Sequence, residues 1–297
     1  MDDLPRVTIV TPSFNQAAFL EQTIQSVLQQ PYPNIEYMVL DGGSTDGSAE
    51  ILRKYGSRLA YWHSQKDRGQ WDAINQGLRK ATGQIVAYLN SDDCLAEHAV
   101  EKIVRSFQEH PDIALVYGRS LTIDTDGRRT GERNSWDWDL NSVLTEWKNP
   151  IPQPSAFLRK DLFSTYGLFD ERWTFIADFA FWLRIGFHER FLYLPEVLSF
   201  TRYHGETKTA TIGNVLAREL IQLCSETVKT TEFRDTGIDP QLSTRAVFHL
   251  ASHFYREGGH RMDALKTYAS YCRMAFSPPV ALYRSCRYLA GLIFKTW

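Results

Sequence analysis

The fold class of this chain is decided by Ile85-Val86-Ala87-Tyr88-Leu89-Asn90-Ser91-Asp92-Asp93. The apolar part starts with β-branched residues and predicts a buried strand. Ligands of open α/β folds bind beyond the carboxyl ends of the strands, which is where the polar residues stand. Asp92 and Asp93 repel each other unless a cation such as Mg²⁺ or Mn²⁺ lies beside them, so they indicate a metal site. The simpler alternative is that they cap the helix that follows.

Composition and charge argue against several classes of protein. The 297 residues suffice for one large domain or two smaller ones, and a hydrophobic fraction of 43% supports a sizeable core. A net charge of -2 gives no basic field, so we expect no nucleic-acid partner. The cysteines are far apart, which argues against a zinc knuckle or a disulfide framework and indicates a reducing compartment. We also expect no signal peptide and no transmembrane segment.

Strand and helix signals alternate through the first part of the chain, up to Tyr117. Such alternation implies right-handed crossovers and a mostly parallel sheet, which is an α/β fold. Strands are predicted at 7–11, 35–40, 59–63, 84–89 and 113–117, and helices at 17–29, 48–55, 71–81 and 95–109.

The pattern changes from Arg119 onward, where a hairpin turning at Asp126-Gly127 and a proline-rich connection over Asn149–Pro154 are predicted. We therefore expect two domains, an α/β domain over 1–210 and a helical C-terminal region over 211–297. The remaining predictions are a helix at 178–187, strands at 191–194 and 197–203, and helices at 215–229, 240–256, 262–276 and 280–294.

The loop after the second strand, Asp41-Gly42-Gly43-Ser44-Thr45-Asp46-Gly47, has the composition of a ligand-binding loop. Its glycines let the backbone approach a ligand, and we interpret Asp41 at the strand tip as a contact to a base or ribose. For Ser44 and Asp46 we favour a tight turn that caps the next helix. No dinucleotide fingerprint and no P-loop motif is present in the sequence.

Polar residues farther along the chain raise the same question of ligand or structural role. Asp178 stands among apolar residues, and a charge there is costly unless it is paired or used, although it could simply cap the following helix. His204 ends the last predicted strand beside Arg202; a ligand role and a structural role are both open. His249 and His253 have the spacing of a metal pair, but no third ligand is evident and we expect no zinc site.

Taken together, these stretches resemble the inverting family-2 glycosyltransferases, and the resemblance covers residues 5–206. Val7–Asn15 is similar to the family's nucleotide-side first strand, and Asp41–Asp46 to its Asp-Asp-Gly-Ser-x-Asp loop. Asn90–Asp93 is similar to the Asp-x-Asp metal motif. Ala177-Asp178 is placed like the Glu-Asp pair whose Asp is the catalytic base. Arg202-Tyr203-His204 resembles an element whose His can complete the metal site.

The resemblance implies a GT-A fold with a Rossmann-like, mostly parallel sheet and a C-terminal helical appendage. It implies transfer of a sugar from a nucleotide-diphosphate sugar, with a UDP-sugar favoured, to a saccharide or lipid-linked saccharide. Asp178 would deprotonate the acceptor hydroxyl, and Asp92 with His204 would bind Mn²⁺ or Mg²⁺. For Arg68 a surface position is the equal alternative to donor binding. Contacts to the donor are implied for Thr11, Pro12, Phe14, Asn15, Asp41, Arg68, Asn90 and Ser91.

Departures from the family pattern leave rival interpretations open. Gly42 replaces the second Asp of the base-binding loop, so the loop no longer indicates which nucleotide the donor carries. Asn90 replaces the first Asp of the metal motif, so it ligates the metal weakly or contacts the ribose instead. Ala177 replaces the Glu before the base. These changes motivate the alternative of a module that binds sugar nucleotides without turnover. A nucleotidyltransferase is disfavoured, because no glycine-rich basic loop follows the first strand.

The resemblance also implies polysaccharide or glycolipid assembly in the cytoplasm, with the inner face of the membrane as a further expectation. Residues 278–297 contain Arg284, Arg287 and Lys295 and no acidic residue, with apolar residues near helical spacing. A basic amphipathic helix of this kind can lie in a membrane interface. The alternative is that it packs on the preceding helices with its basic face in water.

Overall fold

The computed structural model of the chain describes residues 4–204, 213–275, 280–281 and 283–288. The chain divides into two compact units. The helical region expected from residue 211 falls within the second unit, which also includes two segments from the middle of the chain; a domain boundary after residue 210 stays a prediction. Unit 1 comprises Met1–Trp138, Pro150–Glu171 and Arg184–His204, and unit 2 comprises Asp139–Asn149, Arg172–Leu183 and Gly205–Trp297.

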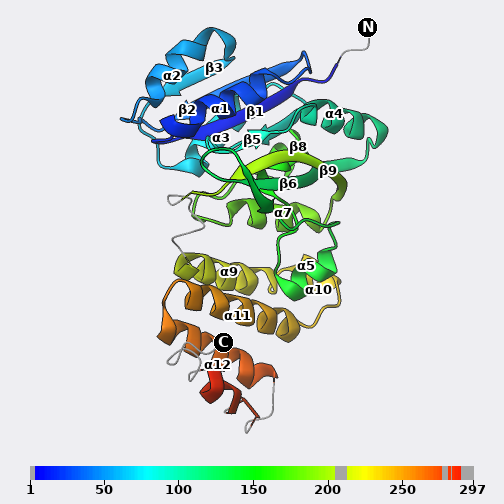
Figure 1. Ribbon diagram of the computed structural model, residues 1–297. Helices are drawn as coiled ribbons and strands as arrows, with labels where there is room; N and C mark the ends of the chain where they lie inside the picture. Colours follow the sequence, from blue (N-terminus) through cyan, green and yellow to red (C-terminus); the bar gives the residue numbers. More distant parts are fainter. Residues whose placement is uncertain (1–3, 205–212, 276–279, 282, 289–297) are drawn as a thin grey trace. The chain divides into compact units, whose positions relative to one another are not determined.

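Unit 1 is built on a nine-stranded sheet in the described part of the chain, in the order β3-β2-β1-β4-β8-β6-β9-β5, with β7 paired to β6 (Figure 1). The strands β3, β2, β1 and β4 are parallel, and β8 is antiparallel to both β4 and β6. The strands are β1 (Val7–Ser13), β2 (Ile35–Asp41), β3 (Tyr61–Ser64), β4 (Ile85–Tyr88), β5 (Cys94–Leu95), β6 (Ile113–Ile123), β7 (Arg129–Glu132), β8 (Phe157–Arg159) and β9 (Arg190–Arg202).

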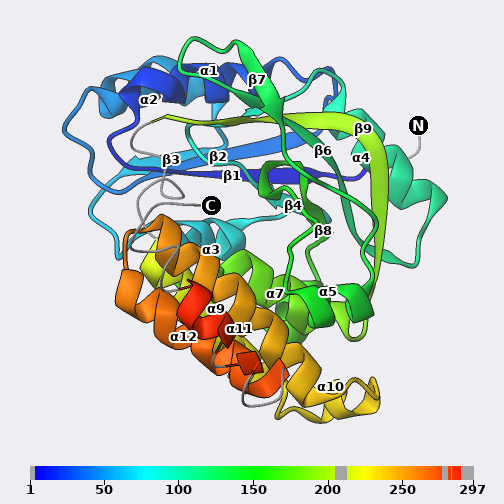
Figure 2. The same ribbon diagram turned by 60° about the horizontal axis from the view of Figure 1, so that its bottom comes forward.

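Helices cover both faces of this sheet, as expected for an α/β fold. Figure 2 shows α1 and α2 on one face and α3 on the other. A Cβ at Gly77 of α3 would lie 2.4 Å from Val10 Cγ1, so only glycine lets α3 approach β1 this closely. The helical elements of this unit are α1 (Ala17–Leu28), α2 (Ser48–Tyr55), η1 (Gly56–Arg58), α3 (Gln70–Lys80), α4 (Ala99–Glu109), η2 (Gln153–Ser155) and α6 (Leu162–Tyr166).

The parallel strands bring their carboxyl ends to one edge of the sheet. Ser13 at the end of β1 pairs with Asp41 at the end of β2, and Asp41 pairs with Ser64 of β3. On the other side of β1, Val10 pairs with Tyr88 at the end of β4. The loops after β1, β2 and β4 therefore begin at the same edge, as the sequence predicted for a ligand-binding site.

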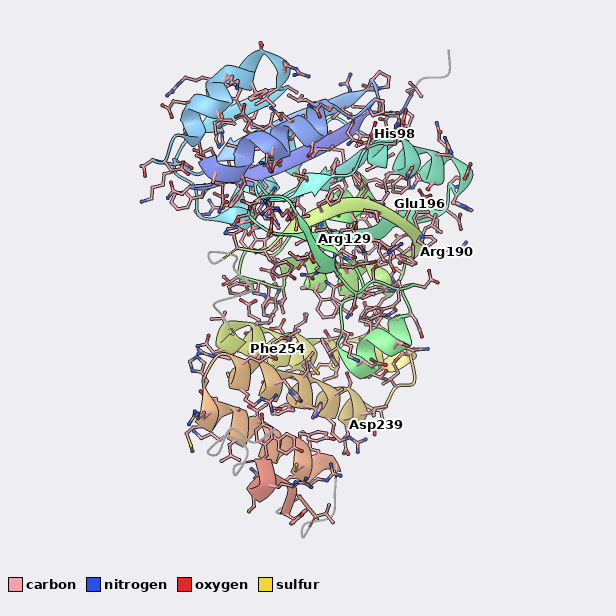
Figure 3. The ribbon with its side chains drawn as sticks, viewed as in Figure 1. His98, Arg129, Arg190, Glu196, Asp239 and Phe254 are labelled. Atoms are coloured by element: carbon pink, nitrogen blue, oxygen red, sulfur yellow. The ribbon has the colours of Figure 1, made fainter. Side chains whose placement is uncertain are left out.

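The predicted helix at 95–109 is too long by its first turn. Cys94 and Leu95 form β5, which pairs with β9, and α4 starts only at Ala99. His98, labelled in Figure 3, has a left-handed backbone with φ of 60° directly before the helix. Sheet pairing therefore overrides the helical pattern of this stretch.

Several short elements were not predicted, among them α6 and α10 (Thr231–Asp235), and two predicted strands form one strand. The hairpin turning at Asp126-Gly127 is confirmed as β6 and β7. The strands expected at 191–194 and 197–203 form a single strand, β9, whose pairing with β6 has register shifts. The proline-rich stretch contains η2 and leads into the unpredicted strand β8, while α5 (Leu140–Glu146) was also missed. Three-residue and seven-residue elements are too short to produce a clear period.

Unit 2 consists of helices in its described part, and α9, α11 and α12 pack as neighbours (Figure 1). Asp239, labelled in Figure 3, begins α11: its carboxylate accepts a hydrogen bond from the backbone N–H of Gln241 at 2.9 Å. The predicted helices at 215–229, 240–256 and 262–276 are confirmed to within a few residues. The helices are α5, α9 (Gly213–Thr227), α10 (Thr231–Asp235), α11 (Pro240–Glu257) and α12 (Arg261–Ala275), and α7 (Ala177–Gly186) begins in this unit.

The predicted helix at 280–294 is described only in part. Residues 280–281 and 283–288 are helical, and Tyr288 stacks on Tyr268 of α12 with ring centroids 4.1 Å apart. The rest of the proposed membrane segment, including residues 289–297, lies outside the described residues. Among the residues described, none of the helices combines the length and the hydrophobicity that a membrane span requires.

Candidate functional site

The predicted metal ligands Asp92 and His204 meet although 112 residues separate them in sequence. His204 Nε2 lies 3.1 Å from Asp92 Oδ2, and the side chains are 6% and 18% exposed. The ring of Phe19 packs 4.8 Å from the His204 ring, measured between centroids. The carboxylate is a ligand that suits Mn²⁺ or Mg²⁺, and the imidazole nitrogen favours the transition metal Mn²⁺ of the two. They also form an ion pair if the imidazole is protonated.

Arg202 fixes the loop that carries these ligands, and its side chain is buried, with 1% exposed. Its backbone N–H donates to Asp93 Oδ1 at 2.9 Å, and its Nε donates to the carbonyl of Asp92 at 2.9 Å. The guanidinium also donates to the carbonyl of Asp124 and to Gln22 Oε1, at 2.7 Å each. One arginine therefore joins strand β9, the Asp92-Asp93 turn, helix α1 and the β6–β7 loop.

Asp93 is turned away from solvent, unlike Asp92. Its side chain is 3% exposed, and its carboxylate accepts the hydrogen bond from Arg202. Burial, followed by the nearby Asp92 carboxylate, raises the pKa of Asp93 well above its usual value. The two adjacent carboxylates thus have different environments: Asp93 lies in the protein interior, and Asp92 is oriented toward His204.

Asn90, at the first position of the metal motif, belongs to a chain of amides. Gln70 Nε2 donates to Asn90 Oδ1 at 2.8 Å, and Asn90 Nδ2 donates to Gln153 Oε1 at 3.3 Å. Gln153 in turn donates to the backbone carbonyl of Tyr88 at 2.7 Å. Both polar atoms of Asn90 are therefore already used within the protein. Ser91 is buried, and its carbonyl accepts a hydrogen bond from Thr23.

On the predicted donor side, Phe14 and Asn15 follow β1. The Phe14 side chain is 61% exposed, which is unusual for a large apolar residue beside polar loops. Asn15 has a left-handed backbone with φ of 52°. Its N–H donates to Ser44 Oγ at 2.7 Å, and its Oδ1 accepts from the N–H of Thr45 at 3.0 Å. The loops after β1 and β2 are therefore joined, with Phe14 at their surface.

Thr11, Pro12 and Asp41 are placed less favourably for contact with a ligand. All three are buried, and Thr11 Oγ1 lies 3.0 Å from the hydroxyl of Tyr37. The Asp41 carboxylate is 0% exposed and accepts hydrogen bonds from within its own loop and from Ser64. These donors are the backbone N–H groups of Gly43 and Ser44, and the hydroxyls of Ser44 and Ser64. The side chain of Asp41 holds the loop together; its predicted contact with a base stays a prediction.

For Arg68 the sequence left two interpretations open, a surface position and binding of the donor. Its side chain is 71% exposed, and its guanidinium lies 2.7 Å from Asp72 and 2.8 Å from Glu171. These carboxylates hold it at the start of α3, and its exposure leaves it accessible to an anion. The predicted contact of Arg68 with the donor stays a prediction.

Asp178, the predicted base, lies in the first turn of α7 in unit 2. Its Oδ1 accepts a hydrogen bond from the N–H of Phe179 at 2.8 Å. Ala177 before it is fully buried, and Trp182 one turn later is among the largest buried side chains. Asp178 itself is half-buried. Its carboxylate thus lies in the first turn of a largely buried helix, and its bond to the adjacent N–H is not the bond that a cap residue makes, so the alternative of a helix cap stays a prediction.

Several residues that orient the site through hydrogen bonds could not be recognised in the sequence. Gln70 and Gln153 orient Asn90, and Gln22 anchors Arg202, yet isolated glutamines follow no pattern. Arg202 had a partial signal, because it stands near the end of the predicted strand 197–203, beside the candidate ligand His204. In the described part of the chain, no three His, Cys, Asp or Glu side chains gather into a metal site. A cation here would therefore need oxygen atoms from water or a substrate as further ligands.

The sequence profile described as "Glycosyl transferase family 2" matches residues 8–167, which is more than half of the chain. The chain belongs to glycosyl transferase family 2. The "PGL/p-HBAD biosynthesis glycosyltransferase" of Mycobacterium bovis is 33% identical over 185 residues, which are 61% of this chain and 69% of that protein. An uncharacterized glycosyltransferase of a Nostoc strain is 28% identical over 216 residues, which are 67% of this chain and 65% of that protein.

Solved structures confirm the GT-A fold of this family-2 chain. S. aureus TarS, residues 1–349 in complex with UDP-GlcNAc, superposes with a TM-score of 0.69 at 14% identity, over 97% of this chain and 90% of that 1–349 chain. The mannosyltransferase PcManGT of Pyrobaculum calidifontis, in complex with GDP-Man and Mn²⁺, gives a TM-score of 0.61 at 20% identity. That match covers 98% of this chain and 81% of PcManGT.

Proposed function

We propose that this chain is an inverting, metal-dependent glycosyltransferase that moves a sugar from a nucleotide-diphosphate sugar to an acceptor hydroxyl. The observation that supports this most is the pairing of Asp92 with His204 at the carboxyl edge of the sheet, held by the buried Arg202. A site for a cation that accompanies a diphosphate accounts for both residues.

The chemistry of the donor set fits Mn²⁺ or Mg²⁺. Mg²⁺ sites typically use one or two carboxylates together with substrate phosphates and water, and Asp92 with His204 would offer one carboxylate and one nitrogen. When bound, such a cation stabilises the negative charge that develops on a diphosphate leaving group. Arg202 bonds the backbone carbonyl of Asp92, so it holds the backbone that carries this carboxylate. Both polar atoms of Asn90 bond Gln70 and Gln153, so a contact of Asn90 with ribose or metal would require one of these hydrogen bonds to be exchanged.

For the donor we favour a UDP-sugar. TarS has been solved with UDP-GlcNAc and PcManGT with GDP-Man, so nucleotide sugars of both kinds are bound by proteins of this fold. Exposed Phe14, on the loop that Asn15 fastens to Ser44 and Thr45, offers an aromatic face for stacking a base. Arg68 would interact with the diphosphate or sugar, and Pro12, Thr11, Asp41 and Ser91 would shape the loops around it.

Asp178 would act as the general base. It would accept the proton of the acceptor hydroxyl while the hydroxyl oxygen forms a bond to the anomeric carbon and the bond to the nucleoside diphosphate breaks. Attack from the side opposite the leaving group inverts the anomeric centre. General-base assistance of this type contributes roughly 10²–10⁴-fold to the rate. Asp178 is present although Ala177 departs from the family pattern. Its presence favours catalysis over the alternative of a module that only binds sugar nucleotides.

For the acceptor we propose a saccharide or lipid-linked saccharide, in polysaccharide or glycolipid assembly on the cytoplasmic side of a membrane. The mycobacterial relative is named for PGL/p-HBAD biosynthesis, and that name supports a role in glycan or glycolipid assembly. Residues 278–297 would provide a peripheral contact with the membrane.

A donor panel tests the proposed function directly. The purified chain is incubated with UDP- and GDP-sugars and Mn²⁺, with and without EDTA, and release of the nucleoside diphosphate is measured. We expect turnover of at least one donor, lost in EDTA and in Asp92→Ala. A donor that raises the thermal midpoint but is never turned over, with any acceptor extract, would instead establish the binding module.

A further inference from the structure

Helix α9 holds the segment that leads into the helix of Asp178, and it does so through one buried carboxylate. Glu219 Oε1 accepts a hydrogen bond from the backbone N–H of Thr174 at 2.6 Å. Glu219 Oε2 accepts from the N–H groups of Phe175 at 3.0 Å and Ile176 at 3.3 Å. Three consecutive N–H groups therefore point at a single side chain, and Asp178 follows two residues after the last of them.

This contact supplies what the local sequence lacks. N–H groups at and before the start of a helix have no partner inside the helix and need acceptors from elsewhere. Ala177 offers no acceptor, and the Asp178 carboxylate bonds the N–H of Phe179 on the other side. Glu219 is only 8% exposed, so its carboxylate has little contact with water. The three N–H groups replace that water as hydrogen-bond donors and offset the cost of burial. Hydrogen bonds to an ionised acceptor are about twice as strong as neutral ones.

A second carboxylate of α9 contacts the same segment from the surface. Glu226, two turns after Glu219, pairs with Arg172 at 2.6 Å, and the two side chains are 40% and 51% exposed. The Arg172 guanidinium also lies over the Trp173 ring, 4.5 Å from its centroid. An exposed pair of this kind contributes at most about 1 kcal/mol. Glu226 is therefore a matched control: it has the same chemistry on the same helix and bonds the same segment, but it does not reach the N–H groups next to Asp178.

We propose that Glu219 is a positioning residue for Asp178. It fixes the backbone at Thr174–Ile176 and thereby the direction in which the first turn of α7 presents the Asp178 carboxylate. This proposal rests on the proposed function, in which Asp178 is the base. Displacing a catalytic group by about 1 Å can lower the rate on the order of 10²-fold. The hydrogen bonds of Glu219 to Thr174–Ile176 should therefore affect kcat. The C-terminal helices accordingly contribute to catalysis through α9.

Kinetics of Glu219→Gln and Glu226→Gln test the proposal. In Glu219→Gln the introduced amide can accept through one oxygen only, and its NH₂ group faces N–H groups, so the segment loses part of its hold. We expect kcat to fall about 10- to 100-fold in Glu219→Gln, with the KM for the donor unchanged, because the donor residues proposed above lie in unit 1. Glu226→Gln should keep kcat within about twofold. Equal kcat in Glu219→Gln and wild type would overturn the proposal, as would a fall in kcat that is matched by Glu226→Gln.

A double variant separates positioning from general damage to the fold. In Asp178→Asn the base is absent, so adding Glu219→Gln should lower the residual rate no further. A further drop of the same size as in wild type would show that Glu219 acts independently of Asp178 and overturn the proposal. Glu219→Asp, which keeps the charge, should recover part of kcat, and it replaces Glu219→Gln should that variant fail to fold; no recovery by Glu219→Asp counts against positioning. Full activity of Asp178→Asn by itself would overturn the proposed base, whereas an inactive Asp178→Asn with a fully active Glu219→Gln overturns only the positioning role.

Discussion

At the scale of single residues, the proposed reaction depends most on Asp178, the proposed general base. An amide at this position keeps the shape and can still accept the N–H of Phe179, but it cannot take a proton. We expect Asp178→Asn to lower kcat by at least about 10²-fold while the affinity for the donor stays nearly unchanged. Steady-state kinetics together with donor titration measure both quantities. Retention of more than about a tenth of the wild-type kcat would show that another group is the base.

The pair of Asp92 and His204 makes a separate prediction about the cation. Asp92 supplies the carboxylate, so Asp92→Ala should remove activity at every Mn²⁺ concentration. In the proposed site His204 would be a secondary ligand, so His204→Ala should raise the Mn²⁺ concentration needed for half-maximal rate. Metal titrations of the transfer rate check both variants. Full activity in excess EDTA would rule out the metal site, and an unchanged titration of His204→Ala would remove that residue from it.

The hydrogen bonds of Arg202 lead to a prediction about the free energy of unfolding, which can be tested without a substrate. Arg202→Met removes the donors to the carbonyls of Asp92 and Asp124, which belong to half-buried residues, and to the exposed Gln22. We expect a loss of about 1.5–3 kcal/mol in the free energy of unfolding, because the hydrogen bonds from an ionised donor are lost. Arg190, labelled in Figure 3 on the same strand β9, is 75% exposed and pairs with Asp112. Arg190→Met is the control and should cost less than about 1 kcal/mol in urea unfolding.

At the scale of secondary-structure elements, Asp46 joins two helices. Its carboxylate accepts hydrogen bonds from the N–H of Ala17 at 2.8 Å and of Ser48 at 3.1 Å, the first residues of α1 and α2. Partial desolvation opposes ionisation, but the hydrogen bonds from Ala17 and Ser48 outweigh it and hold the pKa of Asp46 below its usual value. The sequence had favoured such a capping role for Asp46 over a ligand role.

The pH dependence of stability follows from the direction of this shift. A carboxyl whose pKa is lower in the folded chain stabilises the fold above its unfolded pKa of about 3.9, and this contribution disappears as the pH falls through the folded pKa. Asp46→Ala should therefore cost about 1 kcal/mol at pH 7 and progressively less below about pH 4. Urea unfolding of wild type and variant at pH 7 and near pH 3.5 measures the difference. A cost that stays constant with pH would assign the effect to packing rather than to the charge.

The elements also show where the sequence was sufficient. Up to Leu89 the predicted helices and strands agree with the structure to within two residues at each end, and α2 matches at both ends. Farther on, α4 starts four residues later than predicted and β6 continues past Tyr117 to Ile123. β8 was missed because three residues carry no period, and β5 because its two residues are strand only through pairing with β9. Within the site, Asp92 and His204 were predictable from polar residues at strand ends. The amides of Gln70 and Gln153 and the carboxylate of Glu219 were not, since their roles depend on contacts between distant segments.

At the scale of the whole molecule, the open question is whether the chain acts at a membrane surface. Residues 278–297 carry three basic residues and no acidic one. Tyr288 is 9% exposed, and its hydroxyl donates to the carbonyl of Ser252 in α11 at 3.1 Å, so one turn of this stretch packs on unit 2. Tyr283 is 64% exposed and Val280 is 42% exposed. Packing through Tyr288 and contact with lipid through the exposed residues are compatible, because a helix has two faces.

Co-sedimentation with vesicles decides this point. We expect the full chain to bind anionic vesicles and a chain ending at Ser277 to bind less. Because Tyr288 packs on α11 and α12, the truncation also disturbs unit 2, so the sharper variant is Arg284→Glu with Arg287→Glu in the full chain. Each basic residue near an anionic surface contributes about 1 kcal/mol, so removing two should weaken binding by at least about 30-fold. Equal binding by the full chain and both variants, or none by any of them, would leave a helix that only packs. The lipid-linked acceptor would then have to reach the enzyme by another surface.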